Sequence, residues 1–257
     1  MKNPNTLQKI SVAVLFLTSR CNMKCPFCIT SDQTESFPFD EAVALLRRLR
    51  SQSVKYVVLG GGEPTLWRGD LFRLAKEAKG LGFIVQLGTN SIALSPGFEY
   101  ADEIDRYVIP LEAMDEKIHN RLRPYRESHY AIVRDRLQKL KHARKSLTVS
   151  TLITRENIVS ITALAHFLRT YSEQSRLHAW HLYKLIPFGR GGAMHANELD
   201  IPDSDYWRVC RQIQAMKLPF KVYCRGDMYH SKNVEFFWYE KGAVHRGADQ
   251  WGDVSWD

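Results

Sequence analysis

Six short apolar segments alternate with longer amphipathic segments between residues 10 and 186, and this alternation constrains the fold more than any other feature. The apolar segments combine β-branched and other apolar residues, a composition typical of strands buried in a parallel sheet. Between them, apolar side chains recur at helical spacing, and Asp40, Asp70 and Asn157 stand where they can cap helices. The apolar segments span residues 10–18, 54–59, 83–87, 106–111, 147–153 and 178–186.

This alternation predicts a parallel sheet with right-handed crossovers, and hence an α/β fold. Six units are too few for an eight-unit barrel but enough for a partial (β/α)6 TIM-like barrel that is open at one side. Beyond Gly192 the pattern changes to a helix that starts near Pro202 and several short β-type segments. We therefore expect residues 1–192 to form the barrel core and residues 193–257 to form a C-terminal α+β extension that packs against its open side.

Polar and glycine-rich segments follow several of the predicted strands. In parallel α/β folds, catalytic residues lie at the carboxyl ends of the strands. In this chain that edge carries residues 21–28, 60–63 and 89–90, Glu112, and residues 187–192. The functional site is therefore expected at this edge of the sheet.

Cys21, Cys25 and Cys28 fall within eight residues, directly after the first predicted strand. Zinc sites usually combine two separated pairs of ligands, which this spacing does not provide, although a structural zinc site or a plain thiol loop stays open. Three soft thiolates on one loop suit an iron–sulfur cluster. Since a cubane cluster has four irons, three cysteines leave one iron for another ligand.

The chain carries 36 Lys and Arg against 28 Asp and Glu, a formal net charge of +8. This charge is compatible with an anionic ligand such as a nucleotide, but also with a solvated basic surface. The basic residues are spread along predicted helices, so nucleic acid is not favoured as a partner. The N-terminal residues lack a small-residue cleavage site and no apolar run is long enough to cross a bilayer, so we expect a cytoplasmic protein without a membrane span.

The cysteine spacing, with Phe27 directly before the third cysteine, and the Gly-Gly-Glu-Pro of residues 61–64 after the second strand together resemble the radical S-adenosylmethionine (radical SAM) superfamily over residues 10–190. The resemblance implies a [4Fe–4S] cluster on Cys21, Cys25 and Cys28, with SAM chelating the open iron. It also implies an electron donor such as flavodoxin or ferredoxin, and a 5′-deoxyadenosyl radical that abstracts hydrogen from a small-molecule, nucleotide or peptide substrate.

The resemblance also assigns SAM-binding roles to residues of the two motifs. Phe27 is expected near the adenine. Gly61 and Gly62 are expected to let the backbone approach the methionine part of SAM, and Glu63 to pair with its ammonium group. A helix N-terminal carboxylate without a ligand is the alternative for Glu63.

Further SAM contacts are expected after later strands. Thr89 and Asn90 lie where relatives often carry Thr-Asn-Gly, and would offer a hydroxyl and an amide to SAM, although Ser91 replaces that glycine.

Glu112 ends the fourth predicted strand, where relatives often carry aspartate, and Arg123 is expected to reach the SAM carboxylate. An alternative is that Glu112 and Arg123 pair with each other or with solvent. From the fifth strand, Thr151 or Ser150 is expected to face the site.

The residues predicted to act on the substrate are Tyr183, Lys184, Cys224 and Tyr229. Cys210 lies on the apolar stripe of its predicted helix, so we expect a buried, inert thiol. Two cysteines outside the loop cannot hold the auxiliary clusters of the SPASM type. The sequence therefore predicts a single cluster and reduced thiols.

The sequence leaves open which branch of the superfamily the chain resembles. Residues 179–184, 187–192, 227–230 and 234–244 resemble segments of viperin-like enzymes, which convert a nucleoside triphosphate to its 3′-deoxy-3′,4′-didehydro analogue. A second hypothesis is a radical SAM enzyme that modifies a peptide or a biosynthetic metabolite. A non-catalytic iron–sulfur redox or regulatory module is a third, against which the intact Gly-Gly-Glu-Pro argues, since an electron carrier needs no SAM site.

Overall fold

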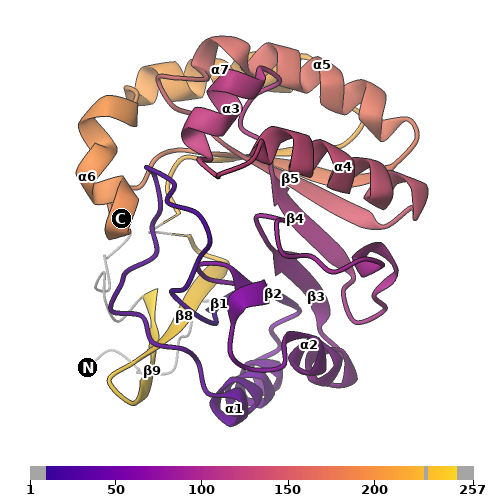
Figure 1. Cartoon of the computed structure of the whole chain (residues 1–257), viewed down its shortest axis with the longest axis vertical. Helices are drawn as coiled ribbons and strands as arrows, with labels where there is room; N and C mark the ends of the chain where they lie inside the picture. Colours follow the sequence, from indigo (N-terminus) through magenta and orange to yellow (C-terminus); the bar gives the residue numbers. More distant parts are fainter. Residues whose placement is uncertain (1–9, 229–230, 248–257) are drawn as a thin grey trace.

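The computed structural model describes residues 10–228 and 231–247, and all of its strands belong to one curled sheet (Figure 1). The strand order is β7-β6-β5-β4-β3-β2-β1-β8-β9. Strands β1 to β8 are parallel to their neighbours, and β9 pairs antiparallel with β8. The strands are β1 (Val12–Phe16), β2 (Tyr56–Gly60), β3 (Ile84–Gly88), β4 (Arg106–Pro110), β5 (Ser146–Leu152), β6 (Arg176–Tyr183), β7 (Lys221–Arg225), β8 (Val234–Glu240) and β9 (Ala243–Arg246).

The six predicted strands are confirmed as β1 to β6, in sequence order and parallel, so the α/β partial-barrel prediction is confirmed. The C-terminal residues extend this sheet at both edges, because β7 pairs with β6 and β8 pairs with β1. The expected boundary at residue 192 falls within α6 (Gly189–Leu199). The curl therefore consists of eight parallel strands.

Helices surround the outer face of the curl (Figure 1). The other helices are α1 (Phe39–Ser51), α2 (Leu71–Gly80), α3 (Glu116–Leu122), α4 (His129–His142), α5 (Ile161–Ser172) and α7 (Asp203–Ala215). Asp70 caps α2 as predicted, accepting a hydrogen bond from the Arg73 backbone N–H at 2.9 Å. Among the described helices, none has the length and apolar character needed to cross a bilayer.

Two predicted caps are wrong. Pro38 occupies the N-cap position of α1, and Asp40 lies in its first turn. Asn157 makes no capping bond, because its side chain spans buried backbone groups instead. Its amide donates to the carbonyls of Glu112 and Leu152, both at 2.8 Å, and accepts from the Thr154 backbone N–H at 2.8 Å.

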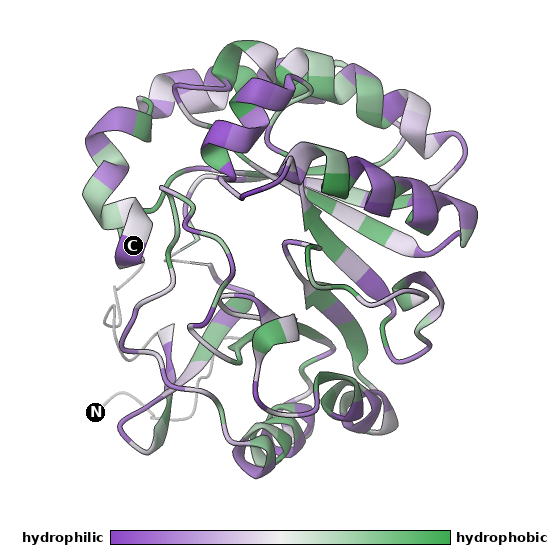
Figure 2. Cartoon of the chain, viewed as in Figure 1, coloured by the Kyte–Doolittle hydropathy of each residue, from purple (hydrophilic) through white to green (hydrophobic). Residues whose placement is uncertain are grey.

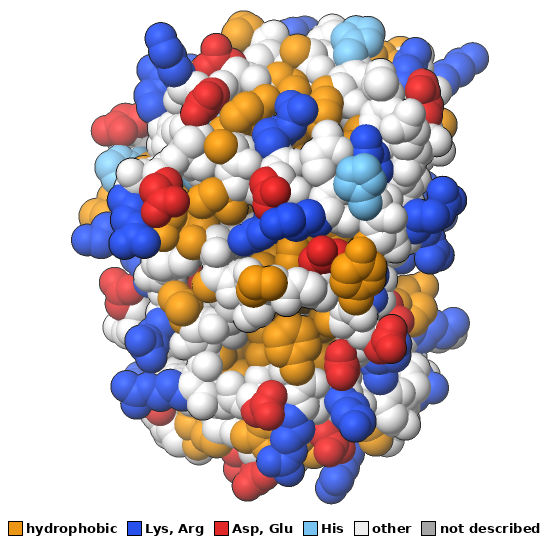
Figure 3. All heavy atoms as spheres, turned by 45° about the vertical axis from the view of Figure 1, so that its right-hand side comes forward, with side chains coloured by type: hydrophobic (Ala, Val, Ile, Leu, Met, Phe, Trp, Pro, Cys, Tyr) orange, Lys and Arg blue, Asp and Glu red, His pale blue; other side chains and the backbone are white. Residues whose placement is uncertain are grey.

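The strands alternate between a packed outer row and an open inner row. In β1, Ala13 and Leu15 are fully buried beneath the helices, whereas Val12, Val14 and Phe16 are half-buried and face the inside of the curl. Figure 2 shows hydrophobic residues along the strands and hydrophilic residues over much of the surrounding helices. Figure 3 shows Lys and Arg interspersed with Asp and Glu over one face of the molecule. The core therefore lies outside the sheet, and the interior is left for a ligand.

Replacing Asn157 with alanine should lower the free energy of unfolding by about 2–4 kcal/mol, because two buried carbonyls and one N–H lose their partners. Urea unfolding of the purified protein measures this. Asn197→Ala, on the exposed side of α6, is the matched control and should change stability by no more than about 0.5 kcal/mol. Equal effects of the two substitutions would contradict this role.

Candidate active site

The cysteine loop lies directly against the turn that follows β2. The backbone N–H groups of Gly62 and Glu63 donate to the carbonyls of Thr18 and Arg20, at 2.7 and 2.8 Å. A Cβ on Gly61 would lie 2.7 Å from the Thr18 carbonyl oxygen, and one on Gly62 would lie 2.4 Å from that of Arg20. The two glycines are therefore required by the packing of one loop on the other, a reason independent of SAM.

The first turn of α6 holds the other side of the loop. Gly191 and Gly192 both donate their backbone N–H to the Cys28 carbonyl, at 3.0 and 3.1 Å. A Cβ on Gly191 would lie 2.4 Å from the Cys25 carbonyl oxygen. Gly189 has φ +76°, a left-handed conformation that favours glycine. The Gly-Arg-Gly-Gly sequence thus begins a helix whose close approach secures the cysteine loop.

Each of the three cysteines faces a nitrogen donor from another part of the chain. Asn90 Nδ2 lies 3.7 Å from Cys21 Sγ, and Arg123 Nη1 lies 3.9 Å from Cys25 Sγ. Arg190 lies beside Cys28: although burial lowers its pKa, the Cys28 thiol and Asp32 raise it overall. Its Nη2 is buried without a hydrogen-bond partner among the described residues.

This environment fits a [4Fe–4S] cluster on Cys21, Cys25 and Cys28. Burial raises the pKa of Cys25 to about 11 and also raises that of Cys21, so these thiols stay protonated without a metal. Cluster binding requires thiolates, and nitrogen donors beside the sulfurs stabilise the electron-rich cluster. Arg190 and Asn90 were not predicted in this role, although the Gly-Arg sequence at the start of α6 was a visible signal.

Glu63 is fully buried, and its carboxylate already accepts four hydrogen bonds. Oε1 accepts from the Thr65 backbone N–H (3.2 Å), the Thr65 hydroxyl (2.8 Å) and the Thr89 hydroxyl (2.7 Å), and Oε2 accepts from the Asn90 backbone N–H (2.7 Å). Burial raises its pKa despite these bonds. Glu63 therefore braces the loops after β2 and β3, and its pairing with the SAM ammonium stays a prediction.

Ser91 occupies the place where the resemblance expects glycine, and it adopts φ +74°. This left-handed conformation is the one that glycine would favour, so the turn is retained at the cost of strain. The Asn90 side chain closes the turn by accepting from the Ile92 backbone N–H at 3.0 Å, and it also donates to Asn22 Oδ1 at 2.7 Å. The turn thus joins the end of β3 to the cysteine loop.

Glu112 and Arg123 form a buried ion pair, which was the alternative to direct SAM contacts. Glu112 Oε1 accepts from Arg123 Nε and Nη2 at 2.8 and 2.7 Å, and Oε2 accepts from the Leu152 backbone N–H at 2.8 Å. The guanidinium also lies 4.7 Å from the centre of the Phe27 ring. Arg123 therefore connects the end of β4 to the cysteine loop.

Two buried histidines link the Glu112 loop to the Asn90 turn. The Glu112 backbone N–H donates to His119 Nδ1 (3.1 Å), His119 Nε2 contacts His129 Nδ1 (2.8 Å), and His129 Nε2 contacts the Asn90 carbonyl (2.8 Å). Because the first group can only donate and the last can only accept, both imidazoles must be neutral, each with its proton on Nε2. Burial, together with Arg123 and the neighbouring imidazole, lowers the pKa of His119 to about 2. Burial and Arg123 lower that of His129 to about 4.

The inside of the curl is a cavity of about 550 Å³ that begins beside Phe27 and Arg123. Ser150 and Thr151 of β5 both line the cavity, but the Thr151 hydroxyl is already engaged, donating to the Leu111 carbonyl (2.6 Å) and accepting from Trp180 Nε1 (2.9 Å). Of the two candidates on this strand, both therefore reach the cavity, and the SAM contact predicted for either stays a prediction.

Two of the four predicted substrate residues line the cavity. Tyr183 contacts His181 Nδ1 through its hydroxyl at 3.0 Å, and Lys184 is paired with Asp200 and Asp203 at 3.3 and 3.0 Å. The other two do not line it. Cys224 contacts Gln214 Nε2 at 3.7 Å on the helix side of β7, and Tyr229 lies outside the described residues. Cys210, as predicted, is buried in the core.

Comparison with known proteins agrees with this geometry. The Radical SAM superfamily profile matches residues 15–168, more than half of the chain, so the chain belongs to this superfamily, whose members use a [4Fe–4S] cluster and SAM. The AdoMet-dependent heme synthase of Oleidesulfovibrio alaskensis is 26% identical over 211 residues, 76% of this chain and 52% of the synthase. The S-adenosylmethionine-dependent nucleotide dehydratase of Lacinutrix mariniflava is 24% identical over 216 residues, 79% of this chain and 44% of the dehydratase.

A solved structure supports the same fold. Streptococcus suis SuiB bound to S-adenosylmethionine has a TM-score of 0.69 at 16% identity, covering 85% of this chain and 51% of SuiB. SuiB has also been solved bound to its precursor peptide SuiA. At this identity the likeness shows the fold alone. The chain spans about half the length of the curated relatives it matches.

Replacing Ser91 with glycine should raise the free energy of unfolding by about 1 kcal/mol, because it relieves the left-handed backbone and removes a buried hydroxyl without a partner among the described residues. Ser53→Gly is the matched control, since Ser53 also has a positive φ of 65° but is exposed. The difference between the two, measured by urea unfolding, reports the buried hydroxyl. A destabilised Ser91→Gly variant would contradict the prediction.

Stability should fall as the pH drops below about 6.5, the ordinary pKa of histidine, because the fold binds His129 in its neutral form and the unfolded chain takes up the proton. This contribution is fully present above pH 6.5 and is lost progressively down to about pH 4. The slope for one histidine is about 1.4 kcal/mol per pH unit.

His129→Gln, whose amide can accept and donate at similar positions, should reduce that slope by about one proton in urea unfolding of the cluster-free protein. His166→Gln, on the exposed side of α5, is the matched control and should leave the slope unchanged. Identical pH profiles for His129→Gln and the unmodified chain would show that the histidine pair does not titrate in this way.

Proposed function

We propose that this chain is a radical SAM enzyme that abstracts hydrogen from a substrate held inside the curled sheet. The observation that carries this proposal is the cavity of about 550 Å³, which extends from Phe27 and Arg123 into the interior and is lined by all eight parallel strands. An iron–sulfur module that only transfers electrons has no use for such a cavity. The third reading of the sequence, a non-catalytic module, is therefore disfavoured.

When bound, a [4Fe–4S] cluster on Cys21, Cys25 and Cys28 supplies the electron that cleaves SAM to methionine and a 5′-deoxyadenosyl radical. The chain's own contribution is to hold and orient. Arg123, Arg190 and Asn90 place nitrogen donors beside the sulfurs, and Phe27 presents its ring to the cavity. The apolar inner faces of β1, β2 and β8 exclude water, which a reactive radical requires.

The substrate is proposed to be a small molecule, a nucleotide or a peptide, and the electron donor a flavodoxin or a ferredoxin. A specific second candidate is a nucleotide dehydratase of the viperin-like kind. It is favoured by the similarity to the Lacinutrix mariniflava dehydratase over 79% of this chain. If it is correct, one of the four ribonucleoside triphosphates should increase formation of 5′-deoxyadenosine above the substrate-free rate. No increase with any of the four would contradict this candidate.

The central proposal is tested by anaerobic reconstitution. The chain should take up about four irons and give a reduced-cluster EPR signal that shifts on addition of SAM. With dithionite it should form 5′-deoxyadenosine, and Cys25→Ala should abolish that product because the cluster loses a ligand. Cys210→Ala, a thiol on α7 in the core, is the matched control and should retain the product. An EPR signal indifferent to SAM would overturn the proposal.

A further inference from the structure

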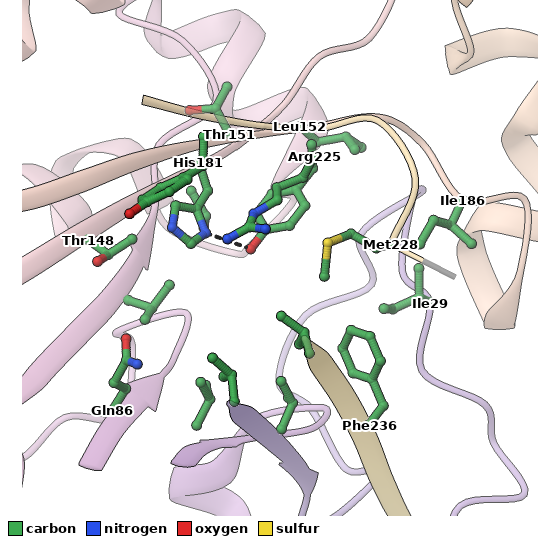
Figure 4. Close-up of a pocket in the computed structure, with 18 of the residues that line it drawn as sticks. Ile29, Gln86, Thr148, Thr151, Leu152, His181, Ile186, Arg225, Met228 and Phe236 are labelled. Atoms are coloured by element: carbon green, nitrogen blue, oxygen red, sulfur yellow. Dashed lines mark hydrogen bonds between the residues drawn. The ribbon is translucent and has the colours of Figure 1, made fainter. Parts of the chain in front are cut away.

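The cavity has two chemically different walls (Figure 4). The wall formed by β1, β2 and β8 presents only apolar side chains apart from Tyr56 near its base: Val12, Val14, Phe16, Val58, Val234 and Phe236. The wall formed by β4 to β7 presents mainly polar and cationic side chains, with Val108 and Leu152 as apolar exceptions: Arg106, Thr148, Ser150, Thr151, His178, His181, Tyr183, Lys221, Tyr223 and Arg225. A ligand that fills the cavity therefore meets an apolar surface on one side and donors on the other.

No Asp or Glu is among the described residues that line the cavity, although five Lys or Arg side chains do. Two of these cations are already neutralised, Arg123 by Glu112 at 2.7 Å and Lys184 by Asp200 and Asp203. Arg106, Lys221 and Arg225 make no ion pair with a described carboxylate within 4.0 Å. The polar wall thus carries a positive charge that the lining of the cavity does not balance.

Arg225 is the cation of this wall nearest to the cysteine loop. The sheet register places Arg225 beside Tyr183 and Tyr183 beside Leu152, whose backbone N–H bonds Glu112. Arg225 therefore lies in the same row as the Glu112–Arg123 pair. Its guanidinium lies 4.9 Å from the centre of the Tyr223 ring, a contact that restrains the arm, and it donates no hydrogen bond to another described residue. Figure 4 shows Arg225 and His181 directed toward the same space.

The imidazole beside Arg225 is kept neutral first by burial and then by the positive groups around it. Burial, followed by Arg225, His178 and Arg106, lowers the pKa of His181 to about 3, so this side chain is neutral. Partly buried cations that lack a counter-charge are costly, and a bound anion removes that cost. A guanidinium fork matches phosphate and carboxylate oxygens in both spacing and charge.

We propose that the cavity binds a substrate with an anionic group, a phosphate or a carboxylate, held by Arg225 beside the Tyr183 hydroxyl, and with an apolar body packed against β1, β2 and β8. The proposal rests on the proposed function in taking the cavity as the substrate site. It assigns Arg225 as the residue that selects for charge, a role that requires no cluster and no SAM.

The test uses three small probes on the cluster-free chain: phenyl phosphate, phenylacetate and the neutral 2-phenylethanol. Calorimetry or ligand-observed NMR gives their dissociation constants. At least one anionic probe should bind about tenfold or more tightly than the neutral one, the size expected for a charge-assisted hydrogen-bonded pair. Which anion binds more tightly separates a phosphate-bearing substrate from a carboxylate-bearing one.

Arg225→Met, which keeps most of the length and removes the charge, should abolish the preference for anions, and Arg225→Lys should restore part of it. Arg211→Met, on the exposed side of α7, is the matched control and should leave all three constants unchanged. Equal binding of charged and neutral probes, no measurable binding of either anion, or an unchanged preference in Arg225→Met would overturn the proposal. If Arg225→Met fails to fold, the comparison of the three probes on the unmodified chain still tests whether the cavity prefers anions.

The outcome is separable from the proposed function. Failure of the reconstituted chain to cleave SAM would remove the radical reaction while leaving anion binding by the cluster-free chain intact. Cleavage of SAM without any preference for anions would support the radical reaction and overturn the proposal of an anionic substrate.

Discussion

The Glu112–Arg123 ion pair is the contact on which the arrangement of this site depends. It joins the end of β4, the end of β5 through the Leu152 N–H, the residue after α3 and the cysteine loop through Phe27 and Cys25. A buried pair of charges stabilises a fold only when its other hydrogen-bonding groups are also satisfied. Here Glu112 Oε2 has the Leu152 N–H, and its backbone N–H and carbonyl have His119 and Asn157. The ion pair therefore holds the ends of β4 and β5 together, and Arg123 positions the cysteine loop against them.

The hollow interior follows from a second constraint, the failure of the sheet to close into a complete barrel. In a closed eight-stranded barrel, layers of bulky side chains fill the inside. Here the edge strands β7 and β9 do not pair with each other, so the curl stays open. The inward rows of opposite strands, which carry valines as well as bulky side chains such as Tyr183 and Tyr223, do not meet. The bulky residues Trp180, Tyr107 and Tyr206 are buried away from the cavity. The sheet is therefore stabilised by its helices from outside, which leaves room for a ligand within.

Much of this arrangement could be predicted from the sequence, because it depends on local patterns. The six strands, the Asp70 cap and the position of the cysteine loop each follow from a few neighbouring residues. The first turn of α6 was not predicted, because Gly189, Gly191 and Gly192 are typical of a loop and reveal their purpose only against the backbone of Cys25 and Cys28. The role of Asn157 could not be predicted for a similar reason. Its side chain bonds the backbone carbonyls of Glu112 and Leu152, and no sequence pattern marks such partners.

The inward and outward faces of β7 show the same limit on a single strand. Period-two alternation predicts that Cys224 and Arg225 face opposite ways, but it cannot say which one faces the cavity. Cysteine is the more reactive residue, which made Cys224 the natural candidate, yet register with β6 directs Lys221, Tyr223 and Arg225 inward. Register is a property of the whole sheet, so it lies beyond what a short segment encodes.

Phe27 and Arg123 belong both to the surroundings of the thiols and to the lining of the cavity. A ligand in the cavity that contacts either side chain therefore acts on the cysteine loop through direct contacts. Binding effects of this kind are reciprocal. If a group bound by the cysteine loop changes the affinity of the cavity for its ligand, the ligand changes the affinity of the loop for that group by the same factor. The Phe27 ring contacts the Arg123 guanidinium, and the guanidinium contacts Cys25. Through these two contacts, a ligand bound in the cavity can affect the loop that carries the cysteines.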